Sequence, residues 1–161
     1  MKKIDIGQTV GVLANVGVIA GIIFLAVELT QNQELMRAQT RNEMSRTIIE
    51  LNTLSMDDRF ASLILKGQAG EPLSDIENFQ YARWANNWLR YWENVTYQRS
   101  MGLFDDEEWN AQRTIMRFRL NNDIGLRDAF CGTRQNYSQT MVAIMDESLQ
   151  TPCQQSMEHN E

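Results

Sequence analysis

The hydrophobic positions of this chain follow two patterns, and the first is one unbroken apolar run near the amino terminus. Residues 6–27 hold no charged side chain over 22 positions, between Asp5 and Glu28. Coiled as a helix, the run rises about 33 Å, close to the thickness of the hydrocarbon core of a bilayer. A signal peptide has a shorter apolar region that ends at a cleavage site, whereas here apolar residues continue past the small residues around Ala20. The pattern predicts a retained transmembrane helix within residues 1–28.

Small side chains recur along one side of this predicted span. At about 100° per residue they fall within an arc of about 120°, and they are Gly7, Gly11, Ala14, Gly17 and Gly21. Helices associate in lipid by close approach of their backbones, which such a stripe permits. The stripe favours packing against copies of the same helix or a partner helix, although small residues are common in spans generally. The glycines do not form a nucleotide-binding loop, since neither a Gly-Lys-Ser/Thr sequence nor a preceding strand accompanies them.

Two polar residues lie on or beside the stripe: Asn15 near the middle of the span and Glu28 at its end. A polar group inside a bilayer is costly unless it has a partner, so Asn15 is a candidate for hydrogen bonds between helices. In a ring of copies the same residues would line a pore. An ordinary single span also tolerates one Asn and one interfacial Glu, so the pore is the alternative interpretation.

After the span, apolar positions become sparse and recur at helical intervals, which is the second pattern. No Gly or Pro follows Glu28 until Gly67, so the helix is expected to continue out of the membrane. Its periodic apolar positions are Met36, Met44, Ile48, Leu51 and Leu54. The sequence "SMDD" predicts a break, with Ser55 as N-cap of a short helix over 58–66. The buried face of that helix would hold Phe60, Leu63 and Ile64.

These signals predict juxtamembrane helices over 29–67, a Gly/Pro-rich linker over 68–74 and a helical domain over 75–149. Ser74 and Glu77 form a capping box before a long helix with one aromatic-rich face. Its members are Tyr81, Trp84, Ala85, Trp88, Tyr91, Trp92 and Val95. Aromatic residues at this spacing are more often bundle core than a ligand platform, so we interpret the face as core.

Two further helices complete the predicted domain. The carboxylates at 105–108 suit the positive end of a helix better than a metal, with Asp105 and Glu108 as a cap pair. The last helix, near 136–149, would bury Tyr137, Met141, Ile144 and Met145. The tail over 150–161 is expected to be disordered.

Composition narrows the range of functions. The net charge of −6 argues against nucleic-acid binding, because phosphate binding relies on clustered Lys and Arg. The single histidine, His159, lies in the tail, which removes His-based triads and His metal sites. We therefore predict no enzyme activity, catalytic residue, cofactor, metal or small-molecule ligand. Cys131 and Cys153 could form one disulfide if the domain faces an oxidising compartment.

Three segments resemble a group of small bacterial single-span membrane proteins of unknown function: "GVIAGIIFLAVELTQN", "YWENVTYQRSMGLFDDEEWNA" and "GLRDAFCGTRQNYSQTMVAIMDESL". The resemblance covers roughly residues 7–149 and brings no activity. It implies a final helix after a Gly-x-Arg turn, and a cytoplasmic domain, since such proteins usually carry arginines after the span. Phe130 and Cys131 depart from the pattern, which has a second aromatic residue there. Lys2 and Lys3 also depart from it, and they nearly balance the charge of Arg37, Arg41 and Arg46.

We predict an all-α protein of the bacterial inner membrane, in which a single N-terminal transmembrane helix continues into a small helical bundle domain of four to five helices. The predicted function is that of a homo-oligomeric scaffold, adaptor or accessory subunit. Its partners are the lipid bilayer and itself or another membrane protein. One alternative is a small oligomeric pore or membrane-perturbing factor. The other is a membrane-bound enzyme, which a deep polar pocket with a strongly perturbed carboxylate would indicate.

Overall fold

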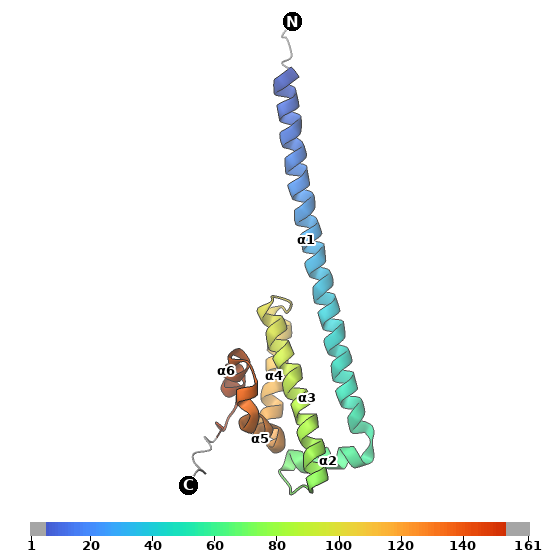
Figure 1. The fold of residues 1–161 in the computed structure, drawn as a ribbon, viewed down its shortest axis with the longest axis vertical. Helices are drawn as coiled ribbons and strands as arrows, with labels where there is room; N and C mark the ends of the chain where they lie inside the picture. Colours follow the sequence, from blue (N-terminus) through green and yellow to red (C-terminus); the bar gives the residue numbers. More distant parts are fainter. Residues whose placement is uncertain (1–5, 154–161) are drawn as a thin grey trace. The chain divides into compact units, whose positions relative to one another are not determined.

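All regular structure in the described part of the chain is helical, as the sequence predicts. The computed structural model describes residues 6–153, except for the side chains of residues 6, 8 and 9. It contains six α-helices and two short 3-10 helices (Figure 1). The chain divides into two units, Met1–Arg41 and Asn42–Glu161. From here on, the name helical domain refers to this second unit, Asn42–Glu161. Lys2, Lys3 and His159, and the tail beyond Cys153, lie outside the described residues.

Helix α1, Ile6–Thr53, is one continuous helix of 48 residues. This confirms that the helix continues past Glu28, and the reason is that no Gly or Pro stands between Gly21 and Gly67. In the helical domain, its last turns bury Met44 and Leu51, and Ile48 packs against the same core. Met36 and Leu54 are exposed instead. The predicted apolar face is therefore buried at Met44 and Leu51 but not along its whole length.

Helix α2, Asp58–Ala69, has a different N-cap from the predicted one. Ser55 lies in the 3-10 helix Leu54–Met56, so its assignment as N-cap is wrong. The cap is Asp57, whose extended backbone lets its carboxylate accept hydrogen bonds from the N–H groups of Arg59 and Phe60 at 3.1 and 3.0 Å. Helix α2 ends at Gly70, which has φ +70°, a conformation that glycine adopts without strain.

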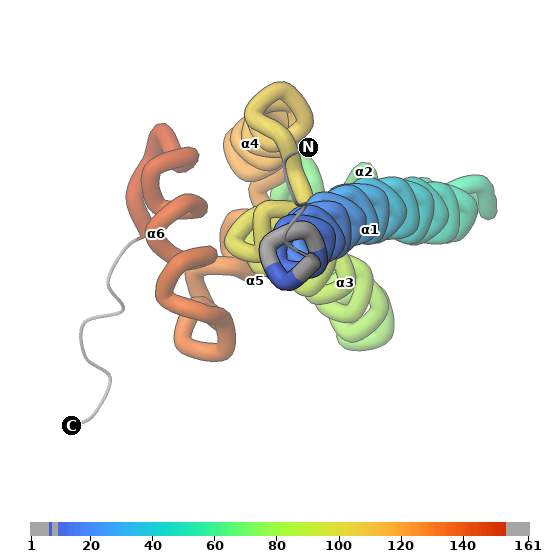
Figure 2. The backbone as a smooth tube through the Cα atoms, turned by 90° about the horizontal axis from the view of Figure 1, so that it is seen from above, coloured from blue at the N-terminus to red at the C-terminus, as the bar shows by residue number. Residues whose placement is uncertain are grey.

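Helix α3, Asp75–Ser100, forms the centre of the helical domain. The capping box of Ser74 and Glu77 is present. All seven members of the predicted aromatic face are buried, which confirms their interpretation as core. Helix α3 contacts α2, α4, α5 and α6, and Figure 2 shows these helices grouped around it.

The three remaining helices are α4, Asp106–Asn122; α5, Ile124–Thr133; and α6, Gln139–Ser148. Asp105 caps α4 through the N–H of Glu108 at 2.8 Å, in agreement with the predicted cap. Tyr137, Met141 and Met145 are buried, and Ile144 packs against the core. The Gly-x-Arg sequence Gly132 to Arg134 lies where α5 ends and the 3-10 helix Arg134–Asn136 begins, ahead of α6. Asp123 starts α5 by accepting a hydrogen bond from the N–H of Leu126.

The capping box predicts a dependence of stability on acid. Lys66 Nζ donates to Glu77 Oε1 at 2.8 Å and the N–H of Ser74 donates to Oε2 at 2.8 Å, and together these bonds lower the pKa of Glu77 from 4.5 to about 2. A lowered pKa in the folded state contributes stability above pH 4.5 that is lost as the pH falls through about 2. Urea midpoints measured between these two pH values should therefore fall more steeply in the native chain than in Glu77→Gln.

The matched control for this prediction is Glu107→Gln, which changes an exposed carboxylate in the first turn of α4. It should leave the slope of stability against pH close to that of the native chain. Equal slopes for the native chain and Glu77→Gln would show that these hydrogen bonds do not hold the carboxylate ionised in solution.

Candidate functional site

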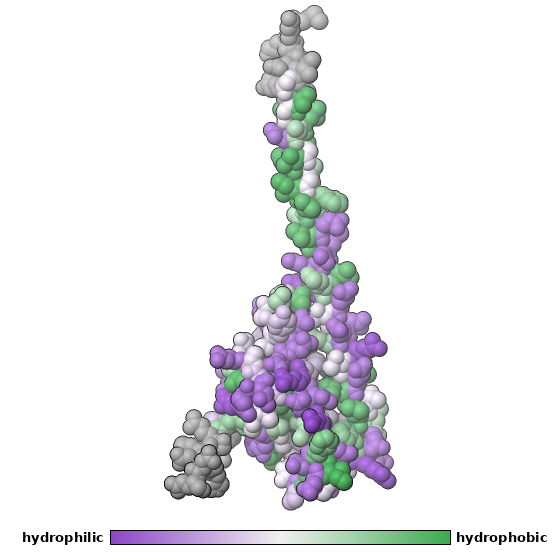
Figure 3. Space-filling view, viewed as in Figure 1, coloured by the Kyte–Doolittle hydropathy of each residue, from purple (hydrophilic) through white to green (hydrophobic). Residues whose placement is uncertain are grey.

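Helix α1 is long and apolar enough to cross a membrane. The helical stretch Val10–Met56 contains an 18-residue window with a mean hydropathy of 2.5, and no part of that window is buried. Figure 3 shows hydrophobic side chains along the visible face of the upper part of α1, whereas hydrophilic side chains dominate the view of the helical domain. Length and composition thus single out this helix as the candidate contact with lipid.

The predicted small-residue stripe lies entirely on α1. Gly7, Gly11, Ala14, Gly17 and Gly21 are all exposed, and so are Asn15 and Glu28. A Cβ atom added to Gly11, Gly17 or Gly21 would meet no atom within 4 Å. Within the unit Met1–Arg41, no residue therefore packs against these three glycines, so their surface can contact another helix.

A second polar site, missed by the sequence reasoning, lies inside the helical domain around Asp123. This carboxylate is only 3% exposed. Its Oδ1 accepts hydrogen bonds from the hydroxyl of Tyr81 and from the N–H of Leu126. Its Oδ2 is enclosed by protein, and the side chain of Gln68 lies close enough to this carboxyl to help lower its pKa. Burial raises the pKa of Asp123, while the hydrogen bond from Tyr81 opposes that rise.

Two glycines fix the position of the Tyr81 ring. A Cβ added to Gly67 on α2 would lie 2.1 Å from Cε2 of that ring, and one added to Gly125 on α5 would lie 2.5 Å from Cε1. Both glycines therefore lie directly against the ring, one at each edge, at distances that exclude any larger residue. This close approach lets the hydroxyl of Tyr81 reach Asp123 and joins α2, α3 and α5. Sequence reasoning placed Gly67 merely at the edge of the linker.

Arg119 lies beside this cluster. Its guanidinium carbon is 3.8 Å from the centroid of the Trp88 ring, which is cation–π geometry. Burial lowers the pKa of Arg119, and the charge of Asp123 partly opposes that effect. An open groove of about 590 Å³ reaches the cluster and is lined in part by Gln68, Arg119 and Asp123.

The contacts of Asp123 join two parts of the helical domain, the Tyr81 side chain on α3 and the first turn of α5. The perturbed carboxylate that a membrane-bound enzyme would need is present, and Asp123 is one of the residues that line the groove, although its Oδ2 is itself buried. Its other oxygen caps α5 and holds Tyr81. Within residues 6–153, no group of three or more acidic, His or Cys side chains is placed to hold a metal ion.

Comparison with known proteins adds no relative. The chain matches no family model, no curated protein and no solved structure. The resemblance to a group of bacterial single-span proteins stays a prediction from three sequence segments, and function has to be inferred from the residues of this chain.

Proposed function

We propose that this protein is a membrane-anchored helical interaction protein, a scaffold or adaptor that α1 fixes in the inner membrane. One observation carries this proposal. Eleven large apolar side chains between Val10 and Val27 are each at least half exposed, with no charged residue among them. In water such a surface costs about 25 cal/mol for each Å² of apolar area. In the hydrocarbon core of a bilayer the same apolar surface carries no such cost.

The balance of free energy supports insertion. Large apolar side chains near the middle of a span each favour insertion by about 0.3 to 0.6 kcal/mol, so eleven of them contribute roughly 3 to 7 kcal/mol. Asn15 is the single strongly polar side chain that opposes them between Val10 and Val27. Extraction of cell membranes with alkaline carbonate should leave the full chain in the pellet. Release into the supernatant would contradict the anchor.

Self-association through the stripe is the second part of the proposal. Gly17 and Gly21 are four residues apart on one face, with nothing within 4 Å of either added Cβ. Two helices that meet on such a face bring their backbones close, which gains van der Waals contact that large side chains would prevent. Asn15 lies next to this face and would gain a hydrogen-bond partner across the same contact.

Replacing both glycines is expected to abolish this association. In a membrane dimerisation assay of the span, Gly17→Ile with Gly21→Ile should reduce the signal to background, because two β-branched side chains would hold the backbones apart. The matched control is Ala20→Ile with Ala26→Ile, which makes the same kind of enlargement outside the arc of about 120°. The control should keep the native signal. Full association of the glycine variant would contradict the interface.

A further inference from the structure

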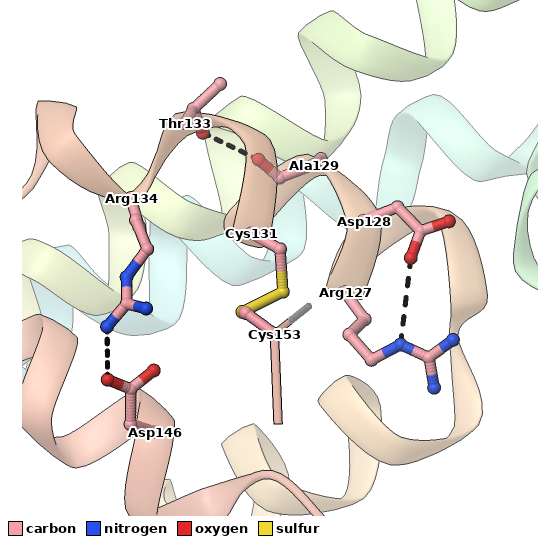
Figure 4. The surroundings of a disulfide bond; sticks show 8 residues. All are labelled: Arg127, Asp128, Ala129, Cys131, Thr133, Arg134, Asp146 and Cys153. Atoms are coloured by element: carbon pink, nitrogen blue, oxygen red, sulfur yellow. Dashed lines mark hydrogen bonds and ion pairs between the residues drawn. A yellow bond between two sulfur atoms is a disulfide. The ribbon is translucent and has the colours of Figure 1, made fainter. Parts of the chain in front are cut away.

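One disulfide joins Cys131 on α5 to Cys153 in the segment that follows α6 (Figure 4). The two Cα atoms are 5.4 Å apart, within the usual range for bridged cysteines, and the residues are 22 positions apart in sequence. The chain has only these two cysteines, so none remains as a free thiol.

Non-covalent contacts bring the two cysteines together. Asn121 on α4 holds the end of α6 and the residues that follow it: its Nδ2 donates to the carbonyl of Ser148 at 2.9 Å, and its Oδ1 accepts from the N–H of Gln150 at 2.8 Å. An ion pair between Arg134 and Asp146 links the start of the connection between α5 and α6 to α6 itself, as Figure 4 shows. Both cysteines pack against the core of the domain. The fold itself therefore places the two sulfur atoms within bonding distance.

We infer that the helical domain lies on the oxidising, periplasmic side of the membrane, with the amino terminus in the cytoplasm. Disulfides form and persist in the periplasm, whereas thiol-reducing systems keep them rare in the cytosol. The inference rests on the proposed membrane span, and it reverses the orientation expected from the arginines after the span. A protein that binds the helical domain would then be a periplasmic protein or the periplasmic part of a membrane protein.

Charges beside the span are compatible with this orientation. Positive residues collect on the cytoplasmic side, counted within about 15–20 residues of the span. Lys2, Lys3 and the amino terminus stand on one side, and Arg37, Arg41 and Arg46 stand on the other. The two lysines are closer to the span than any of the three arginines. The charges are thus nearly balanced, and the disulfide decides between the two orientations.

The orientation is tested by labelling single cysteines in the full chain. The starting variant carries Cys131→Ser and Cys153→Ser, and it receives either Asn110→Cys, at an exposed position on α4, or Lys2→Cys, before the span. Spheroplasts are treated with a membrane-impermeant maleimide before or after lysis. We expect the Asn110→Cys chain to label equally in both samples and the Lys2→Cys chain to label only after lysis.

The reverse result, with Lys2→Cys labelled in intact spheroplasts and Asn110→Cys only after lysis, would overturn the orientation and leave the span standing. Labelling of both chains only after lysis, together with release of the protein by carbonate, would overturn the span and the orientation with it. The labelling variants lack the disulfide, so a second measurement is made on the native chain, which retains both cysteines. After free thiols are blocked in whole cells, a polymer-linked maleimide should shift its gel mobility only when a reductant is added first. If Cys131 and Cys153 were free thiols in the cell, the first blocking step would modify both of them and no shift would follow reduction. That result would also overturn the inference.

Discussion

Gly125→Ala is expected to lower the free energy of unfolding of the helical domain by about 2 to 3 kcal/mol, the cost of overpacking a tight core. A Cβ at this position would lie 2.5 Å from the ring of Tyr81 and 2.8 Å from the carbonyl oxygen of Gly67. The ring cannot move aside freely, because its hydroxyl is bonded to buried Asp123 and its other edge meets Gly67. The carbonyl oxygen belongs to the backbone of α2, so α2 and α5 would have to separate.

Gly132→Ala on the same helix provides the matched control. A Cβ there would meet no atom within 4 Å. Alanine is favoured over glycine in a helix by about 0.5 to 1 kcal/mol, so this variant should be unchanged or slightly more stable. The two substitutions share their chemistry and their helix, and the difference between them isolates the contact with Tyr81.

Denaturation of the full chain in detergent, followed by tryptophan fluorescence, measures both variants. All four tryptophans lie in the helical domain, so the signal reports on that unit alone. A Gly125→Ala chain as stable as Gly132→Ala would contradict the close packing of α2 and α5 around Tyr81.

This packing also shows where prediction from sequence reaches its limit. Gly67 and Gly70 stand three residues apart, Gly67 at the edge of the predicted Gly/Pro-rich linker and Gly70 inside it. Gly70 does end a helix, with φ +70°. Gly67 is inside α2 and is small because a tyrosine from α3 lies against it. Local sequence cannot separate the two roles, since the second depends on a residue that the fold brings close.

Features with a local cause were predictable. The capping box at Ser74 and the aromatic face of α3 depend on spacing within one helix, and both are found as predicted. Helix α5 was missed although Asp123 carries a cap signal, because its short length and its two glycines hid the periodicity. The buried pair of Tyr81 and Asp123 joins residues 42 positions apart, a contact for which a single sequence contains no signal.

Trp92→Ala is expected to lower the free energy of unfolding by about 3 to 5 kcal/mol, which is more than the loss expected for Gly125→Ala. Trp92 is fully buried at the centre of α3, with its ring centroid 5.8 Å from that of Trp88. Truncation removes a large apolar area from the core and leaves a cavity between helices that cannot close around it. Phe118→Ala on α4 is the control, because that ring is 65% exposed and its loss should change stability by about 0.5 kcal/mol or less.

A third variant, Trp92→Phe, separates the two parts of this effect. Nε1 of Trp92 is buried without a hydrogen-bond partner among the described residues, and such a donor costs about 1 to 3 kcal/mol of desolvation. Phenylalanine removes that donor, keeps a ring in the core and leaves only a small void. We therefore expect Trp92→Phe to retain most of the stability that Trp92→Ala loses in the same denaturation experiment. Equal losses in the two variants would mean that the indole N–H is bonded in solution, and that the loss of this bond accounts for the whole effect.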